Sequence, residues 1–156
     1  MPLARRRLRL VRPRSVLQKS ELFRRVSASG WLLRWWQVHS LRRDELDSDG
    51  WSQLFTEDGV FAGGLAQDVM GREALRNVPV DAVALIPEMR HFITNLHCDY
   101  GQDRDTVSAR YYTCITSWKG GGHFYALALA TAELVRRDGG WLISRSDNVM
   151  LPRVES

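Results

Sequence analysis

The sequence is poor in cysteine. Its two cysteines, Cys98 and Cys114, lack the spacing of a zinc site, and its four histidines are dispersed along the chain. In a hairpin that turns near residues 101–105, Cys98 would face about Ser108 instead of Cys114, so a disulfide is not implied. We therefore expect reduced, buried thiols in a cytoplasmic protein, and no bound metal.

Long apolar runs and a phosphate-binding loop are also missing. No apolar stretch approaches membrane-spanning length, and none of signal-peptide length follows the basic start of the chain. The glycine-rich segment 120–122 is predicted to link two strands, whereas a phosphate loop would open a helix. These absences argue against a membrane protein, a secreted protein and a nucleotide enzyme, and we expect no cofactor.

Acidic residues are absent from the first 19 positions, which carry six arginines and one lysine. The other 137 residues carry 15 basic and 18 acidic side chains, so the net charge of +4 belongs to a tail. No basic folded face with stacking aromatics accompanies it, which argues against nucleic-acid binding. Residues 1–19 are interpreted as a poorly ordered arm, a cleaved presequence or translated upstream sequence, and the first is favoured. Residues 20–156 are predicted to form one domain.

The rest of the chain divides into a helical half and a strand half. A helical pattern runs over 20–46 with a possible break at Gly30, and its apolar positions are Leu22, Val26, Leu33, Trp36 and Leu41. A short helix (51–55), a turn (56–59) and a short strand (60–62) follow, then a short helix (71–75) and a connection or helix (79–87). After Pro87 come four long strands over 90–100, 106–119, 123–136 and 141–150, joined by tight turns. This order predicts an α+β fold, in which a curved, mostly antiparallel sheet forms a cone closed by N-terminal helices.

The first long strand carries the most chemistry. Because side chains alternate along a strand, His91, Asn95 and His97 are predicted to share a face with Ile93. An imidazole titrates near neutrality, so His91 is a candidate general acid or base, and the Asn95 amide could bind a substrate oxygen. The alternatives are a hydrogen-bonded structural histidine and a strand-end polar residue.

The third long strand has alanine at every second position from 126 to 132, so one of its faces has almost no side-chain volume. Either a helix lies close against this face or the face leaves room for a ligand, with Trp36, Ala128 and Ala130 as the lining candidates. The opposite side of the sheet bears Phe92, Leu96 and Tyr112, and this apolar surface predicts a homodimer through the outer sheet face.

Five segments in this order resemble the nuclear-transport-factor-two-like cone fold, and within it the SnoaL-like and scytalone-dehydratase-like proteins. They are 46–55 (LDSDGWSQLF), 56–61 (TEDGVF), 71–75 (GREAL), 90–95 (RHFITN) and 134–143 (LVRRDGGWLI). The resemblance covers about residues 31–148. It implies His91 as general acid/base and Asp47 as the group that orients it, although Asp47 could equally be a helix N-cap.

The chain also departs from the scytalone-dehydratase pattern. A second active-site histidine of that family would fall near Ser117, and a serine and an asparagine near Ala128 and Ala130. If Ser117 faces the cavity, Tyr111 and Thr113 face it too, and Tyr111 could donate a proton to an oxyanion or be a core residue. A strict scytalone-type dehydration is therefore not expected.

We hypothesise a cofactor-independent cyclase, isomerase or dehydratase that acts by proton transfer on a hydrophobic, polyketide-like or polycyclic small molecule. A shaped pocket would contribute by holding a flexible chain in a reactive conformation, which favours cyclisation. The main alternative is a non-catalytic binding or assembly module of the same fold, and a weaker one is a supporting subunit of a larger oxygenase.

Overall fold

The computed structural model describes residues 36–103, 105–138 and 140–152. The basic arm, the possible break at Gly30 and the apolar positions Leu22, Val26 and Leu33 lie outside these residues. None of the helices within the described ranges is both long and apolar enough to span a lipid bilayer.

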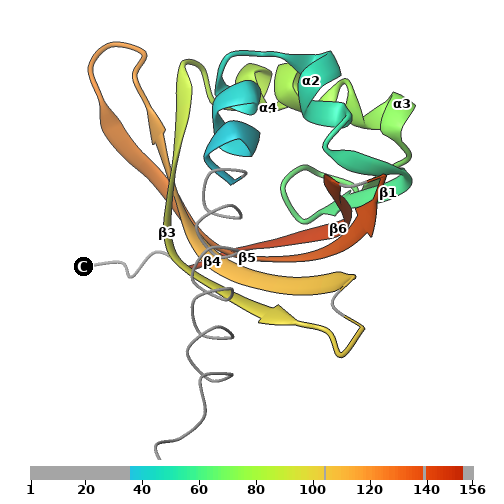
Figure 1. Ribbon diagram of the computed structural model, residues 1–156. Coiled ribbons are helices and arrows are strands. Elements are labelled where there is room, and N and C mark those ends of the chain that lie inside the picture. The colour runs from blue at the N-terminus through green and yellow to red at the C-terminus, as the bar shows by residue number, and fades with distance from the viewer. Residues whose placement is uncertain (1–35, 104, 139, 153–156) are drawn as a thin grey trace, which may run out of the picture.

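The domain is built on one curved sheet of six strands in the order β2-β1-β6-β5-β4-β3 (Figure 1). The strands are β1 (Phe55–Ala62), β2 (Val69–Met70), β3 (Met89–Tyr100), β4 (Thr106–Ser117), β5 (His123–Arg137) and β6 (Gly140–Met150). Every neighbouring pair is antiparallel except β1 and β6, which are parallel. The prediction of an α+β fold with a curved, mostly antiparallel sheet is confirmed.

Strand β1 is longer than the sequence indicated, because the predicted turn over 56–59 lies inside it. Its pairing with β6 shifts register between Phe55 and Val60, so the chain bulges there without turning away. A Cβ atom on Gly59 would lie 2.9 Å from the Phe55 Cβ. Glycine is therefore required by the close approach of Phe55, whereas its φ is not positive.

The helices lie over the concave side of the sheet (Figure 1). They comprise a helix described over 36–44, followed by α2 (Ser48–Ser52), α3 (Arg72–Leu75) and α4 (Val78–Leu85). The first of these packs Trp36 into the core, where its ring centroid lies 4.6 Å from that of Tyr111 on β4. Trp51 of α2 lies 4.8 Å from Phe55 and 5.6 Å from Phe61, so aromatic contacts join the helices to β1.

The inward face of the first helix is more polar than its apolar pattern predicted. Its buried side chains recur at i, i+3, i+4 and i+7 and are those of Trp36, His39, Ser40 and Arg43. Leu41 was predicted to face inward, but it is 55% exposed. The helix therefore brings two basic side chains and a hydroxyl into the domain.

Strand β3 contains a bulge that reverses its side-chain alternation. Its pairing with β4 shifts between Thr94 and His97, and Asn95 lies in the left-handed region with φ 55°. Beyond the bulge Leu96 packs against the core, whereas His97 is exposed. The predicted faces of the strand hold from His91 to Ile93 and are wrong for Leu96 and His97.

The small-residue face of β5 is used in both of the ways that the sequence left open. Ala130 and Ala132 are buried in the main core cluster, which also contains Trp36. Ala128, nearer the start of the strand, lines a pocket. The helix thus packs against one part of the alanine face, and the other part borders open space.

Candidate active site

The centre of the site is a buried pair formed by Asp44 and His91. One Asp44 carboxylate oxygen lies 2.5 Å from His91 Nδ1, and the other accepts the His91 backbone N–H at 2.9 Å. Their side chains are only 7% and 3% exposed. Because the end of the first helix holds Asp44 against the start of β3, the carboxylate fixes the ring orientation and favours the tautomer protonated on Nδ1.

The other ring nitrogen, His91 Nε2, is buried and has no hydrogen-bond partner among the described residues. Burial lowers the pKa of His91 below its ordinary value, the nearby Arg43 charge lowers it further, and the Asp44 carboxylate opposes both. The ring is therefore neutral near pH 7. A neutral imidazole with Nδ1–H bonded to a carboxylate presents Nε2 as a proton acceptor.

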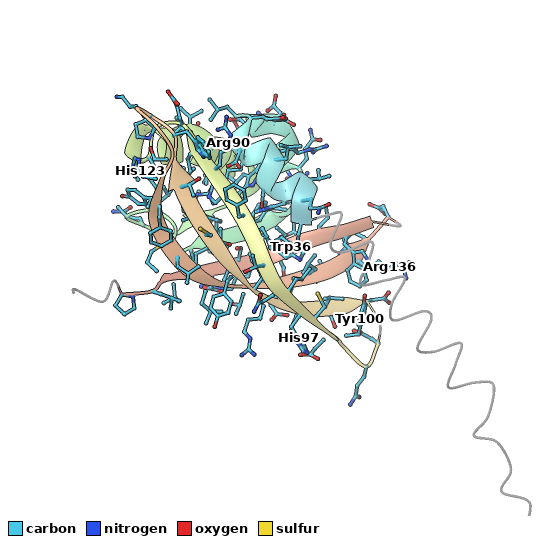
Figure 2. All side chains as sticks on the ribbon, turned by 90° about the vertical axis from the view of Figure 1, so that its left-hand side faces the viewer. Trp36, Arg90, His97, Tyr100, His123 and Arg136 are labelled. Carbon is cyan, nitrogen blue, oxygen red and sulfur yellow. The ribbon has the colours of Figure 1, made fainter. Side chains whose placement is uncertain are left out.

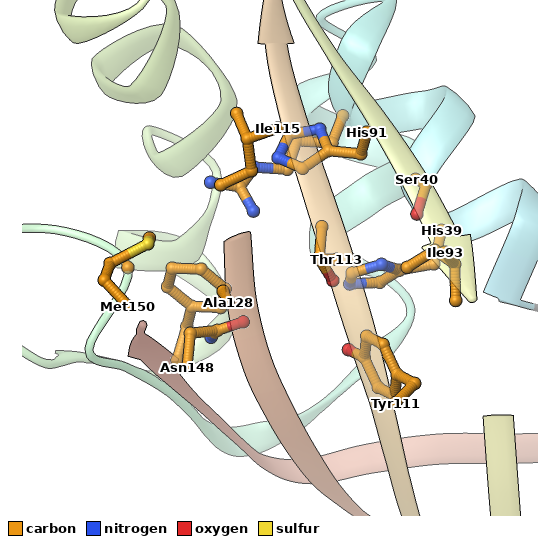
Figure 3. A pocket seen from close by; sticks show the side chains of 13 residues that line it. His39, Ser40, His91, Ile93, Tyr111, Thr113, Ile115, Ala128, Asn148 and Met150 are labelled. Carbon is orange, nitrogen blue, oxygen red and sulfur yellow. The ribbon is translucent and has the colours of Figure 1, made fainter. Parts of the chain in front are cut away.

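A pocket opens beside this pair, between the first helix and the concave face of the sheet (Figure 3). Its lining combines polar and apolar side chains: His39, Ser40, Arg43, Phe61, Gly64, His91, Ile93, Tyr111, Thr113, Ile115, Ala128, Asn148 and Met150. The cavity volume is about 20 Å³, or about 430 Å³ with the spaces between side chains and the open mouth included. The enclosed part holds about one water molecule, so a larger ligand requires side chains to move.

Two further titratable groups line the pocket. Burial, the Arg43 charge and the neighbouring His91 lower the pKa of His39 to about 3, so this imidazole stays neutral at physiological pH. Burial also raises the pKa of the Tyr111 phenol, and the Ser146 hydroxyl and the Arg43 charge partly oppose that rise. Both groups are therefore uncharged.

Arg43 supplies positive charge to the pocket. Its side chain is buried and its guanidinium carbon lies 5.1 Å from the centre of the Phe61 ring. Burial lowers the pKa of Arg43 to about 10, and the Asp44 carboxylate limits that fall. The side chain is therefore still protonated at neutral pH.

The structure corrects the residue that the resemblance paired with His91. Asp47 does not contact the imidazole; it is the N-cap of α2, where its side chain accepts the Gly50 N–H at 2.9 Å. It also lies 3.6 Å from Arg42 at the surface. The difference arises because the helix ends three residues before Asp47, so that Asp44 is the carboxylate on the inward side.

The predicted substrate-binding residues divide into two groups. Tyr111, Thr113 and Ala128 line the pocket. Trp36 and Ala130 are fully buried in the core and are not part of the lining. Asn95 is exposed in the β3 bulge, because the bulge turns its side chain away from the His91 face.

Ser117, at the position where the resembling family has a second histidine, is buried and donates its hydroxyl proton to the Pro87 carbonyl at 2.7 Å. It fastens the end of β4 to the segment before β3 and is not part of the pocket lining. Among the described residues, His, Cys, Asp and Glu side chains form no group of three that could bind a metal ion.

Sequence reasoning missed three polar residues of the first helix, namely His39, Arg43 and Asp44. The available signal was their spacing, since His39 and Arg43 follow Trp36 at i+3 and i+7 on one helical face. Polar residues at positions that a packing helix normally fills with apolar ones indicate a site. The apolar residue Leu41 drew attention to a different face.

Comparison with known proteins identifies the family to which this fold and site correspond. The family model described as "SnoaL-like domain" matches residues 38–147, which include both members of the Asp44–His91 pair. The chain belongs to the SnoaL-like family. No curated protein matches it.

Solved structures share the fold of this SnoaL-like protein. An NTF2-like protein with a cystatin-like fold from Novosphingobium aromaticivorans has a TM-score of 0.72 at 19% identity, over 88% of this chain and 90% of that one. A proposed scytalone dehydratase from the same organism has a TM-score of 0.69 at 14% identity, over 82% and 87%. ActVI-ORFA from Streptomyces coelicolor has a TM-score of 0.66 at 21% identity, over 76% and 94%.

Proposed function

We propose that this SnoaL-like protein is a cofactor-independent enzyme that transfers protons on a hydrophobic, polyketide-like small molecule. The observation that carries the proposal is His91 Nε2, which is buried, lacks a partner among the described residues and belongs to a ring that lines the pocket. Asp44 holds the opposite side of the same ring. This is the arrangement of a general base with an orienting carboxylate.

In the proposed reaction Nε2 removes a proton from a carbon next to a carbonyl group. The C–H electron pair forms a C=C bond while the carbonyl becomes an enolate, and the imidazolium is stabilised by Asp44. Return of the proton to a different carbon isomerises the substrate. Alternatively, the enolate expels a β-hydroxyl group that takes the proton and leaves as water, or it attacks a second carbonyl in the same molecule, whose oxygen then takes the proton.

The apolar part of the lining supports a hydrophobic substrate. Phe61, Ile93 and Ile115 surround the reactive groups and exclude water from them. Met150 lies at the mouth and is 43% exposed, so its flexible side chain is suited to move aside for a ligand larger than the present cavity.

Hydrogen–deuterium exchange tests the proposal directly. We would use 2-tetralone, a bicyclic ketone with acidic α-protons, in D₂O and follow their loss by proton NMR. We expect exchange above the buffer rate, with a loss of roughly 100-fold or more in His91→Gln, as expected for removal of a general base. Asp44→Asn should also lose activity, because an amide does not stabilise the imidazolium.

Two matched variants control for position. His97→Gln changes an exposed histidine on the same strand, and Asp47→Asn changes the carboxylate that the resemblance paired with His91; both should keep the exchange rate. Exchange at the buffer rate while 2-tetralone shifts the His91 ring ¹⁵N resonances would contradict the proposal, because the ligand would then be bound without reaction.

A non-catalytic binding module is the second candidate, and the cavity volume of about 20 Å³ favours it. Under that hypothesis the Asp44–His91 pair would only stabilise the contact between the first helix and β3. Binding of 2-tetralone without exchange, together with a loss of stability in Asp44→Asn, would be its signature.

A further inference from the structure

Arg43 has a buried guanidinium whose Nε–H has no hydrogen-bond partner among the described residues. The residue is 9% exposed, and among the described residues its side chain makes no hydrogen bond and no ion pair. Its guanidinium carbon lies over the face of the Phe61 ring. Burying a cation without an acceptor is costly, so a ligand that supplies an acceptor would be stabilised at this position.

The neighbouring carboxylate does not fill this role. Both Asp44 oxygens are engaged by His91, one through the ring and one through the backbone N–H. Arg43 and His91 line the same pocket, together with the Thr113 hydroxyl and the Asn148 side chain. The Nε–H donor of Arg43 and the proton-accepting Nε2 of His91 are therefore available to one ligand.

We propose that Arg43 binds the substrate oxygen on which negative charge develops, so that this pocket is selective for carbonyl compounds that form enolates. The inference rests on the proposed proton transfer and names its substrate class. As His91 Nε2 takes the α-proton, the C–H electron pair becomes the new C=C bond and the carbonyl π pair moves onto the oxygen. The resulting C–O⁻ group accepts hydrogen bonds from the Arg43 guanidinium.

A ligand with a permanent carboxylate would offer Arg43 the same negatively charged oxygen. We favour the enolate because Arg43 is adjacent in sequence to the partner of the base. Loss of the proton to His91 creates one negative charge on the substrate, and one fixed cation in the same pocket neutralises it. A carboxylate would occupy the guanidinium before the proton moves.

Three naphthalene probes separate these ligands by charge. 2-Naphthol is the aromatic counterpart of the 2-tetralone enol and becomes an enolate-like anion, 2-naphthoate carries a carboxylate, and 2-methoxynaphthalene cannot ionise. Absorbance and fluorescence report the ionisation state of bound naphthol. We expect the wild-type protein to lower the pH at which bound naphthol ionises, and to bind the naphtholate more tightly than the methoxy compound.

Substitutions then locate the effect. Arg43→Met should weaken naphtholate binding by about 10- to 100-fold, the range for a lost charge-assisted hydrogen bond, and leave 2-methoxynaphthalene binding unchanged. Arg43→Lys should restore part of the preference. Arg90→Met, which removes an exposed arginine of β3, is the matched control and should change neither probe. Circular dichroism and thermal melting verify that each variant folds.

The outcomes distinguish this inference from the proposed function. Equal losses for naphtholate and the methoxy compound in Arg43→Met, or no change in naphthol ionisation on binding to the wild type, would overturn it. Stronger Arg43-dependent binding of naphthoate than of naphtholate would replace the enolate by a carboxylate ligand. Ketone exchange that persists in His91→Gln would show that proton transfer by His91 is wrong. If the naphtholate preference also persists in that variant, the Arg43 site remains.

Discussion

Acidification should destabilise this protein through His39. The ring is buried among Trp36, Trp51 and Phe55 beside the Arg43 cation, with centroid distances of 5.3, 5.5 and 6.1 Å to the three aromatic rings. These surroundings lower the pKa of His39 from 6.5 to about 3. Between these values the unfolded chain holds one more proton than the folded protein.

The magnitude follows from that proton difference. Each proton that the unfolded chain binds in excess of the folded protein lowers the unfolding free energy by about 1.4 kcal/mol per pH unit. Lowering the pH from about 6.5 to about 5 therefore removes about 2 kcal/mol through His39 alone. The pKa of His91 is also lowered, so it acts in the same direction. The stability contribution is fully present above the unfolded pKa and is lost as the pH falls towards the folded one.

Urea unfolding at several pH values, followed by tryptophan fluorescence, measures this effect. His39→Leu should be less dependent on pH than the wild type by about 1.4 kcal/mol per pH unit between about pH 6 and pH 5. His97→Leu removes an exposed imidazole and should retain the wild-type slope. Equal slopes of unfolding free energy against pH in His39→Leu and the wild type would refute the reasoning. They would mean that His39 binds its proton as readily in the folded protein as in the unfolded chain.

Three other substitutions test separate parts of the structure. Asp47→Ala removes the N-cap of α2 and should cost about 1 kcal/mol in urea unfolding, with ketone exchange intact; a loss of exchange would return Asp47 to the active site. Ala128→Leu adds three carbon atoms to the pocket lining and should abolish naphthol binding in a calorimetric titration, whereas unchanged affinity would place the ligand elsewhere. The dimer through the outer sheet face stays a prediction: Phe92 is 52% exposed there, and Phe92→Glu should yield monomers in sedimentation experiments if the wild type is dimeric. A dimer that survives this change would exclude that face.

The strand half of the fold was predictable from local patterns. Four long runs separated by glycine-containing or polar turns specify antiparallel neighbours, and the observed β3 to β6 follow them within a few residues. The bulges were not predictable in the same way. They depend on contacts between strands, such as the approach of Gly59 to Phe55, and on a left-handed residue at Asn95 that alternation alone does not reveal.

The polar residues of the site were harder to predict because they depend on how one helix is rotated and where it ends. Residues 43 and 44 are neighbours in sequence, yet Arg43 reaches the pocket over Phe61 while Asp44 reaches β3. A rotation by one residue, about 100°, would turn Arg43 to the direction that Asp44 now has and turn Asp44 away from β3. Sequence periodicity fixes a helix but leaves such a rotation open when apolar residues such as Leu41 occur on its outer side.

The polar face of the first helix also bears on the departures from the scytalone-dehydratase pattern. The polar groups which that pattern places on strands are replaced here by Ser117, which bonds to a backbone carbonyl, and by Ala128 and Ala130, which have no polar side chain. The first helix instead brings His39 and Arg43 to the same pocket. The proposed base, His91, lies on β3, and in the proposed proton transfer Arg43 of the helix would bind the carbonyl oxygen. If the helix supplies that partner through Arg43, the missing strand residues do not argue against catalysis, and the chemistry expected is enolate formation.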